Sequence, residues 1–215
     1  GLQPDAIMLS ATLSACEKAM RWQEALALLF RASRLSVQPD AVSHNAVITA
    51  CGNASRWELS LRVLGRMRLQ AIRPTVVSCN AAIAACGEGG RRADLALALL
   101  AGMRRRALVP DAISYNTLIS VCGKGGRWQL ALRLVEEMEE EMLLPSITSY
   151  GSVMDACRRS GQCDLTLDLL EYLAASSVRP NLVCFNTALA ACERLGLWRE
   201  ASRLLARMRS QSLEP

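Results

Sequence analysis

Asparagine recurs in this sequence at a nearly constant spacing, within segments that otherwise resemble amphipathic helices. With serine and glycine at two equivalent places, the series is Ser10, Asn45, Asn80, Asn116, Gly151 and Asn186. Asparagine disfavours a helix interior because its side chain competes for backbone hydrogen bonds, so its repeated use in a first turn needs a reason. The two candidate reasons are helix capping and a ligand-binding face. We favour the ligand-binding face, because serine already stands two residues before three of the four asparagines and a second cap would be redundant.

The prolines give the register of this series. All seven lie 35 or 36 residues apart, at Pro4, Pro39, Pro74, Pro110, Pro145, Pro180 and Pro215. Self-similarity at this period is typical of a solenoid, in which each repeat buries its apolar face by stacking on its neighbours. The predicted repeats are 6–40, 41–75, 76–111, 112–146, 147–181 and the incomplete 182–215, after the end of a preceding repeat at 1–5. The third repeat has one additional residue, which we assign to the turn "GEGGRR".

Each repeat is predicted to be a helical hairpin. In the fourth, Tyr115, Ile119 and Cys122 form one apolar stripe with helical spacing. A second stripe follows the break at 123–126 and consists of Leu132, Val135 and Met138. No sustained alternation of period two predicts a strand. We expect caps on the first helices from the serines four residues after proline, which are Ser43, Ser78, Ser114 and Ser149.

Composition and charge bound the class of protein. The chain has 215 residues, of which 51% are hydrophobic, so it can bury a large core. The longest apolar run, at 93–103, has about half of the roughly 20 residues that a membrane span needs, so we expect no membrane partner. The net charge of +5 suits a polyanionic partner without establishing one. The chain opens at Gly1 without the features of a signal peptide, so any targeting segment is expected outside it.

Cysteine follows the same period, at the eleventh position of each repeat: Cys16, Cys51, Cys86, Cys122, Cys157 and Cys192. A zinc site needs ligands that converge, whereas these are spaced one per hairpin, and the chain has no CxxC pair and a single histidine, His44. We therefore expect buried packing residues, no metal and no cofactor. Disulfides are disfavoured because stacked hairpins lie roughly 8–10 Å apart, beyond the Cα separation that a disulfide spans. A reducing compartment is favoured.

Other conspicuous residues have structural explanations. Tryptophan opens the second helix in four repeats, at Trp22, Trp57, Trp128 and Trp198. These rings could stack on bases, but their distance from the asparagine series favours core residues that wedge one hairpin against the next. The glycine-rich segments "CGEGGRR" and "CGKGGRW" lack the P-loop motif and are predicted to be turns between helices. The acidic run 136–142 and the basic run 104–106 are expected on a solvated outer face.

Three further positions accompany the asparagine series. The last residue of each complete repeat is polar and directly precedes a first helix: Asp40, Thr75, Asp111, Ser146 and Asn181. The second residue is mostly apolar and β-branched: Ile7, Val42, Val77, Ile113, Thr148 and Val183. The thirteenth is basic in four repeats, at Lys18, Lys124, Arg159 and Arg194. The fifth and last residues could read bases, the second could form flat walls, and the thirteenth could contact phosphates.

The repeats "AVSHNAVITACGNASRWELSLRVLGRMRLQAIRPT" and "AISYNTLISVCGKGGRWQLALRLVEEMEEEMLLPS" resemble the pentatricopeptide repeat (PPR) of the P class. The resemblance covers 6–215, as a fragment of six tandem repeats. It implies an all-α fold, a right-handed α-solenoid, that binds single-stranded RNA with one base per repeat. Fifth and last residues would read the base. Family members usually act in mitochondria or chloroplasts, in RNA processing, stability or translation. The tetratricopeptide repeat is similar, but its tryptophan lies in the first helix.

The family's code, carried over to this sequence, implies one base for each repeat. Ser10 with Asp40 implies G, Asn45 with Thr75 a pyrimidine, and Asn80 with Asp111 implies U. Asn116 with Ser146 implies C, Gly151 with Asn181 leans to A, and Asn186 implies a pyrimidine with a partner beyond Pro215. The expected target is 5′-G-(C/U)-U-C-A-(C/U)-3′. Hydrogen-bonding chemistry agrees in part, because a carboxylate only accepts, as the N3–H of U requires, whereas a hydroxyl can also donate to N3 of C.

The sequence predicts no enzyme. It lacks the HxE and PCxxC motifs of a nucleobase deaminase and the acidic cluster of a nuclease. A protein-binding helical-repeat scaffold is the alternative function, since concave helical arrays also bind peptides. We favour RNA because the paired polar residues vary from repeat to repeat, which a peptide groove does not require. Protein partners through flanking regions and the oligomeric state stay open.

Overall fold

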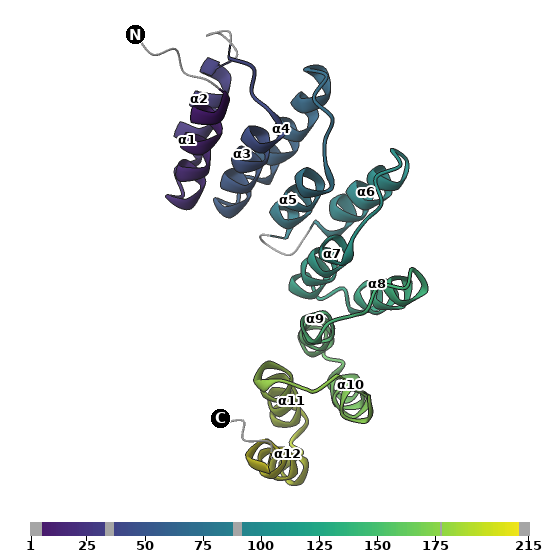
Figure 1. Cartoon of the computed structure of the whole chain (residues 1–215). Coiled ribbons are helices and arrows are strands. Elements are labelled where there is room, and N and C mark those ends of the chain that lie inside the picture. Colours follow the sequence, from purple (N-terminus) through teal and green to yellow (C-terminus); the bar gives the residue numbers. More distant parts are fainter. Residues whose placement is uncertain (1–5, 33–36, 88–91, 177, 211–215) are drawn as a thin grey trace. The chain divides into compact units, whose positions relative to one another are not determined.

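The computed structural model describes residues 6–32, 37–87, 92–176 and 178–210. These ranges contain helices and no strand, so the expected all-α class is confirmed. The helices are α1 (Ala6–Lys18), α2 (Trp22–Ala32), α3 (Ala41–Asn53), α4 (Trp57–Leu69), α5 (Val76–Cys86), α6 (Ala93–Arg104), α7 (Ala112–Lys124), α8 (Trp128–Glu140), α9 (Ile147–Arg159), α10 (Cys163–Ala175), α11 (Leu182–Leu195) and α12 (Trp198–Ser210). Figure 1 shows them as successive hairpins. Among the described residues, no helix is both long and apolar enough to cross a membrane.

Where the structure describes the whole turn inside a hairpin, its backbone follows a recurring pattern. The carbonyl of the recurrent cysteine accepts a hydrogen bond from the backbone N–H five residues later, as in Arg56 to Cys51 at 2.9 Å and Arg127 to Cys122 at 3.0 Å. A residue with positive φ lies just before this donor, and it is glycine in the fourth turn, where Gly126 has a φ of 65°. This is the six-residue closure that commonly ends a helix. The "CGKGGRW" segment is therefore a turn, as predicted, whereas most of "CGEGGRR" and its additional residue fall outside the described residues.

The chain divides into two compact units, Gly1–Ser114 and Tyr115–Pro215. In the first unit, α3 packs between α1 and α5, and α2 and α4 pack against the following first helix as well as their own. In the second unit, α9 packs on α11, and α10 contacts both of them. Within each unit, the second helix of a hairpin thus also packs against the next repeat, which is the stacking that a solenoid requires.

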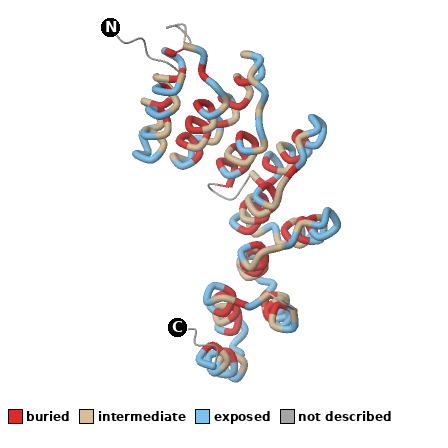
Figure 2. The backbone as a smooth tube through the Cα atoms, viewed as in Figure 1, coloured by how far each residue is buried: buried red, intermediate tan, exposed pale blue. Residues whose placement is uncertain are grey.

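The core lies where these helices meet, as the buried residues in Figure 2 show for each unit. Tyr115, Ile119 and Cys122 are fully buried, which confirms the predicted stripe of the first helix. In α8, Val135 and Met138 are buried while Leu132 is only half-buried. The second helices contribute a periodic series of buried side chains: Ala32, Met67, Met103, Met138, Leu173 and Met208.

The recurrent cysteines are packing residues, as predicted. Five of the six are buried and Cys16 is half-buried, and all nine cysteines of the chain are free thiols. Burial raises the pKa of both Cys51 and Cys157 to about 11. At neutral pH these thiols are therefore protonated and unreactive.

The tryptophans lie at the edge of the core and not inside it, which corrects the sequence-based interpretation in part: Trp22 packs against the core, but none of the four rings is fully buried. Trp198 is 70% exposed and the other three are half-buried. Two of them join consecutive hairpins at the surface, because the guanidinium of Arg56 lies 5.4 Å from the ring centre of Trp22 and that of Arg92 lies 4.5 Å from Trp57. These are cation–π contacts between residues of neighbouring repeats. The wedge role is thus correct for two rings, but the contact is not buried.

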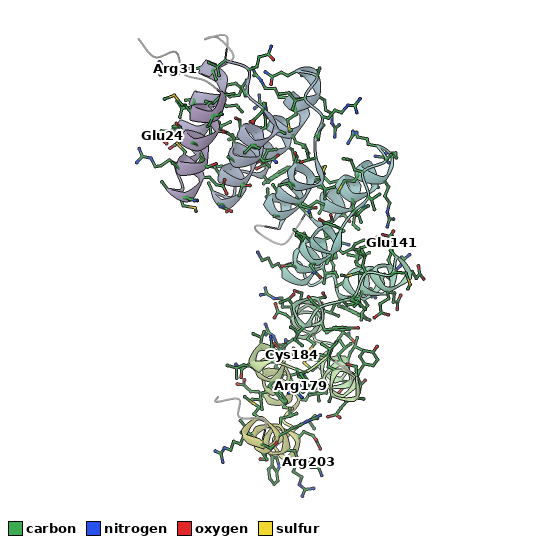
Figure 3. All side chains as sticks on the ribbon, viewed as in Figure 1. Glu24, Arg31, Glu141, Arg179, Cys184 and Arg203 are labelled. Atoms are coloured by element: carbon green, nitrogen blue, oxygen red, sulfur yellow. The ribbon has the colours of Figure 1, made fainter. Side chains whose placement is uncertain are left out.

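The outer charges lie on the second helices, as expected. Glu24, Arg31 and Arg203 are carried by α2 and α12, and Glu141 follows α8 (Figure 3). The arginines of the basic run 104–106 are exposed at the C-terminal end of α6 and directly after it. The first helices are left to form the opposite, candidate binding face.

Candidate nucleic-acid interface

The last residue of each repeat caps the next first helix. Asp40, Thr75, Ser146 and Asn181 are N-caps with extended backbone, and each side chain accepts a hydrogen bond from the backbone N–H three residues on. Asp111 makes the same bond, from Oδ1 to the N–H of Ser114 at 2.8 Å. The predicted caps Ser43, Ser78, Ser114 and Ser149 are therefore wrong. They occupy the third helical position, because the helix starts earlier, directly after the residue that follows proline.

Three of these serines complete a capping box. The hydroxyls of Ser78, Ser114 and Ser149 accept the backbone N–H of the cap residue, at 3.1, 3.2 and 2.9 Å. Such reciprocal bonds satisfy two backbone donors that a helix start otherwise leaves open. The candidate base-reading residues are thereby held at fixed places at the start of each first helix.

Three of the four asparagines at the fifth position bridge consecutive repeats and do not cap a helix. Oδ1 of Asn45 accepts the hydroxyl of Ser78 at 2.6 Å, and Oδ1 of Asn80 accepts that of Ser114 at 2.7 Å. The hydroxyl of Ser149 donates in the same way to Oδ1 of Asn116. All three asparagines remain partly exposed. Their position in the first turn is thus explained by contact with the next repeat, while the rest of each side chain stays accessible.

Asn80 and Asp111 form the most direct of the predicted pairs. Nδ2 of Asn80 donates to Oδ1 of Asp111 at 3.2 Å. Burial raises the pKa of Asp111, but hydrogen bonds from Ser114 and Asn80 outweigh it, so the net pKa is lowered. Asp111 is therefore ionised at neutral pH and presents only acceptors.

The other predicted base-reading residues lie in more varied surroundings. The pairs Asn45 with Thr75 and Asn116 with Ser146 are joined through the intervening serine, since Ser78 and Ser149 contact both members. The Ser10 hydroxyl donates to the carbonyl of Ile7 in its own helix, at 3.1 Å. It has no hydrogen bond to Asp40 among the described residues. Gly151 is buried and Asn186 is exposed.

The predicted apolar walls form a row of exposed side chains at the second position of the first helices. Ile7, Val42, Val77, Ile113 and Val183 are 76%, 57%, 62%, 63% and 59% exposed. Thr148 is exposed as well. Single exposed apolar residues are ordinary, but this series recurs once per repeat at one helical position. The chain thus offers flat apolar surface next to each candidate reading residue.

The four predicted phosphate contacts lie at the C-terminal ends of first helices and are exposed. Arg159 pairs with Asp155 at 2.7 Å, and Arg194 donates to the carbonyl of Arg158 at 2.7 Å. Basic residues also stabilise a helix C-terminus electrostatically. Arg159 and Arg194 would therefore have to exchange an internal partner for a phosphate.

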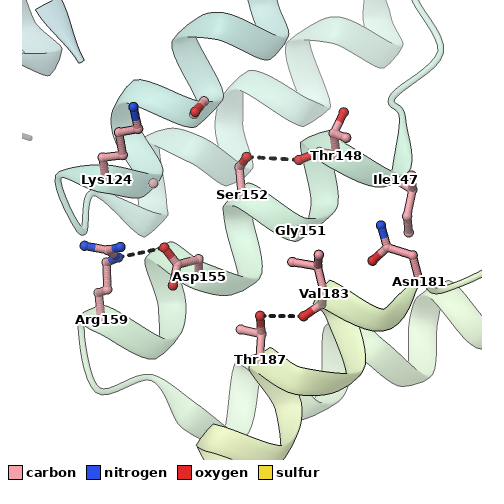
Figure 4. A pocket seen from close by; sticks show the side chains of 12 residues that line it. Lys124, Ile147, Thr148, Gly151, Ser152, Asp155, Arg159, Asn181, Val183 and Thr187 are labelled. Atoms are coloured by element: carbon pink, nitrogen blue, oxygen red, sulfur yellow. Dashed lines mark hydrogen bonds and ion pairs between the residues drawn. The ribbon is translucent and has the colours of Figure 1, made fainter. Parts of the chain in front are cut away.

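One pocket in the second unit unites residues from all the predicted classes. It has a volume of about 400 Å³ and is formed by α7, α9 and α11. The predicted residues that line it are Lys124, Thr148, Gly151, Arg159, Asn181 and Val183. In Figure 4, Lys124 and Arg159 lie at one end of the pocket, and Thr148 and Asn181 at the other. Apolar wall, polar reader and basic end therefore share a single surface.

The sequence reasoning missed several residues of this surface. Ser120, Ser152, Asp155 and Thr187 also line the pocket. Asp155 lies four residues before Arg159, a spacing that predicts an ion pair on a helix and could have indicated it. The close approach of α9 to α7 has a signal too, because a Cβ on Gly123 would lie 2.7 Å from the carbonyl oxygen of Ser152. Glycine at that position permits the contact.

Comparison with known proteins agrees with this architecture. Family models match most of the chain: the PPR repeat family at 74–124 and 110–159, the pentatricopeptide repeat domain at 27–89, and the PPR repeat at 148–176 and 183–213. The comparison with curated proteins found no match.

Solved structures share the fold. The crystal structure of PPR10 from maize is 29% identical, with a TM-score of 0.79 over 96% of this chain and 29% of the maize chain. PPR10 in complex with an 18-nt psaJ RNA element is 22% identical, with a TM-score of 0.75 over 99% of this chain and 34% of that one. The PPR domain of Arabidopsis thaliana protein-only RNase P 1, in complex with tRNA, is 15% identical, with a TM-score of 0.65 over 78% of this chain and 88% of that domain.

The chain spans about a third of the PPR10 chains that it matches. The expected α-solenoid fold is confirmed by these structures and by the stacked hairpins. With family models matching from residue 27 to residue 213 apart from a short gap, the chain belongs to the pentatricopeptide repeat family.

Proposed function

We propose that this chain binds single-stranded RNA in a sequence-specific manner, one base per repeat, with 5′-G-(C/U)-U-C-A-(C/U)-3′ as its target. The observation that carries the proposal is the pocket on α7, α9 and α11, where members of every predicted class line one surface. A nucleotide needs the same set of groups: flat walls for the base, hydrogen bonds at its edge, and positive charge for its phosphate.

The pocket supports a definite orientation of the nucleotide. The base lies between Thr148 and Val183, which precede and follow Gly151, and its edge meets Asn181. The phosphates run past Lys124 and Arg159 at the other end. Because Gly151 contributes no side chain, it leaves room in this pocket for the purine assigned to the repeat.

The biological role follows the family as a proposal. The chain acts in a mitochondrion or chloroplast, in RNA processing, stability or translation. It supplies recognition, and any catalytic step belongs to another domain or protein. PPR10 and the protein-only RNase P domain were each solved with RNA, which supports RNA as the ligand class.

Binding to matched and scrambled RNA tests the proposal. We expect the chain to bind the hexamer, flanked by neutral sequence, at least tenfold more tightly than a scrambled hexamer, because each mismatched base removes about 1–3 kcal/mol in hydrogen-bonded readout. Fluorescence anisotropy at fixed salt measures both affinities. Equal affinities would remove the code, and tight binding to peptides in place of RNA would favour the scaffold alternative.

Exchanging the last residue of a repeat tests the code at one base. Ser146→Asp should shift the fourth base from C towards U by several-fold, because a carboxylate accepts the N3–H of U and cannot donate to C. Aspartate caps a helix as well as serine does, so α9 should keep its start. The reciprocal Asp111→Ser should shift the third base from U towards C. An unchanged preference in both variants contradicts the assignment of the last residue as a reader.

A further inference from the structure

The serine at the third position of a first helix donates a hydrogen bond to the side-chain carbonyl oxygen of the asparagine in the preceding repeat. This contact occurs three times, at Ser78, Ser114 and Ser149. We propose that these serines are positioning residues that decide which side of the asparagine amide meets the RNA. The inference rests on the proposed RNA-binding function and adds a residue outside the fifth and last positions.

The hydrogen-bond partners of each serine hydroxyl determine the direction of its bond with the asparagine. Ser78 and Ser114 are fully buried and Ser149 is 1% exposed, so water does not compete for their hydroxyls. Each hydroxyl oxygen already accepts a backbone N–H from the cap residue. A hydroxyl has one hydrogen, and the asparagine Oδ1 is its nearest acceptor in all three contacts. The side-chain oxygen of the cap residue lies farther from the serine oxygen, at 3.1 Å for Thr75, 2.9 Å for Asp111 and 3.0 Å for Ser146. With Oδ1 occupied, the amide nitrogen is the group that remains to meet a ligand.

Asn80 shows the same orientation held from both sides. Its Oδ1 accepts Ser114, and its Nδ2 donates to Asp111 at 3.2 Å. A reversed amide would put oxygen against the carboxylate, which is repulsive. For Asn45 and Asn116, no partner of Nδ2 lies among the described residues, so the serine alone sets their orientation.

An amide that presents N–H selects pyrimidines by chemistry. Uracil and cytosine both carry the O2 acceptor beside N3, where guanine has an N2–H donor and adenine a C–H. An Nδ2–H directed at this position bonds to either pyrimidine and meets a donor on guanine. A reversed amide would instead offer Oδ1, which suits guanine. The serine therefore excludes guanine by fixing the amide.

The chain contains two natural exceptions to this contact. In the second repeat, the hydroxyl of Ser43 is fully buried and has no hydrogen-bond partner, because the preceding repeat carries Ser10 in place of asparagine. In the sixth repeat the equivalent residue is Cys184, labelled on α11 in Figure 3, and the preceding repeat carries Gly151. A Cβ on Gly151 would lie 4.0 Å from the Cys184 sulfur, so the two positions face each other there too.

Ser149→Ala tests the inference at the fourth base. Four RNAs that differ only at that base are titrated against the unaltered chain and the variant by fluorescence anisotropy. We expect the ratio of C to G affinity to fall about fivefold in the variant, mainly through tighter binding of G, because one oriented hydrogen bond is lost. Ser149→Cys keeps the size of the side chain with a weak donor and should change the ratio in the same direction.

The position in the RNA at which discrimination is reduced should depend on which serine is substituted. Ser78→Ala should reduce discrimination at the second base and leave the fourth unchanged. Ser114→Ala should have a smaller effect at the third base, because Asp111 still holds the amide nitrogen of Asn80. Ser43→Ala is the matched control: it removes a hydroxyl at the same helical position and should change the preference at no base.

The outcomes separate this inference from the function on which it rests. If the unaltered chain discriminates bases and Ser149→Ala and Ser149→Cys keep its C to G ratio, the inference is overturned and the function stands. An equal loss of affinity for all four RNAs also overturns it, because the serine would then only support the fold. If the unaltered chain shows no base preference, both proposals fail.

Discussion

The residue directly before a first helix has two roles: it caps the helix, and it is assigned to read a base. Asp111 accepts the backbone N–H of Ser114 as a helix cap, and it is also assigned to a base edge. Its second carboxylate oxygen is the atom left for RNA. Residues that both cap and read explain why serine, threonine, aspartate and asparagine alternate at this position, since these four types are the preferred N-caps.

The cap at Asp111 predicts a pH dependence of stability. Its folded-state pKa is lowered by hydrogen bonds from Ser114 and Asn80, which outweigh burial. A lowered pKa contributes stability above the unfolded value of about 3.9, and the contribution is lost as pH falls through the folded pKa. The stability difference between the unaltered chain and Asp111→Asn should therefore be larger at pH 7 and shrink below about pH 4.

Thermal unfolding between pH 3 and pH 7 measures this difference. Asparagine is an equally good cap, so the variant should keep α7 and lose only the charge-dependent part. Asp40→Asn should behave alike, because hydrogen bonding from the backbone N–H of Ser43 outweighs burial and lowers the pKa of Asp40 too. A difference that does not change with pH would contradict the assignment.

At the scale of elements, the binding face depends on how closely first helices pack. Gly52 and Gly123 sit near the ends of α3 and α7, where a Cβ would lie 3.0 Å from the Cβ of Ala85 and 2.7 Å from the carbonyl oxygen of Ser152. Because backbone cannot move aside as a flexible side chain can, the second contact is the more restrictive.

Gly123→Ala should destabilise the second unit by about 1–3 kcal/mol, because the added methyl group overpacks this contact and forces α7 away from α9. Urea denaturation followed by circular dichroism measures the change. Gly65→Ala in α4 is the matched control, because nothing lies within 4 Å of its added Cβ. It should stabilise the chain by about 1 kcal/mol through helix propensity. Destabilisation by both substitutions, or by neither, would show that the inter-helix contact is not what matters.

At the scale of the whole molecule, affinity for RNA should depend on salt. Four basic residues at first-helix ends predict that log affinity falls with log salt at a slope near −3, from ~0.7 for each phosphate contact on a single strand. Replacing Lys18 and Lys124 together by glutamine should reduce the slope by about 1.4. Titrations between about 50 and 300 mM KCl, a roughly sixfold range of salt over which the Debye length falls about 2.4-fold, measure the slope. A flat response contradicts phosphate contact and favours a peptide ligand.

The sequence by itself determined the repeat, the pairing of helices and the burial of the recurrent cysteines. These features follow from periodicity within one hairpin, where apolar spacing and proline act locally. The register of candidate readers followed from the same period. The cap was misassigned from the sequence because a capping box holds two suitable side chains three residues apart, and only the extended backbone at Thr75 or Ser146 shows which one precedes the helix.

Only the tertiary structure decided which side chains of one repeat contact which side chains of the next. Asn45 and Ser78 are 33 residues apart, as are Asn116 and Ser149, and each pair meets because one hairpin stacks on the next. The same stacking brings Gly151 and Asn181 to one pocket and leaves the tryptophans at the edge of the expected core. Such contacts depend on how closely and at what angle hairpins pack, and that geometry is set by side chains of two repeats at once, so no single repeat encodes it.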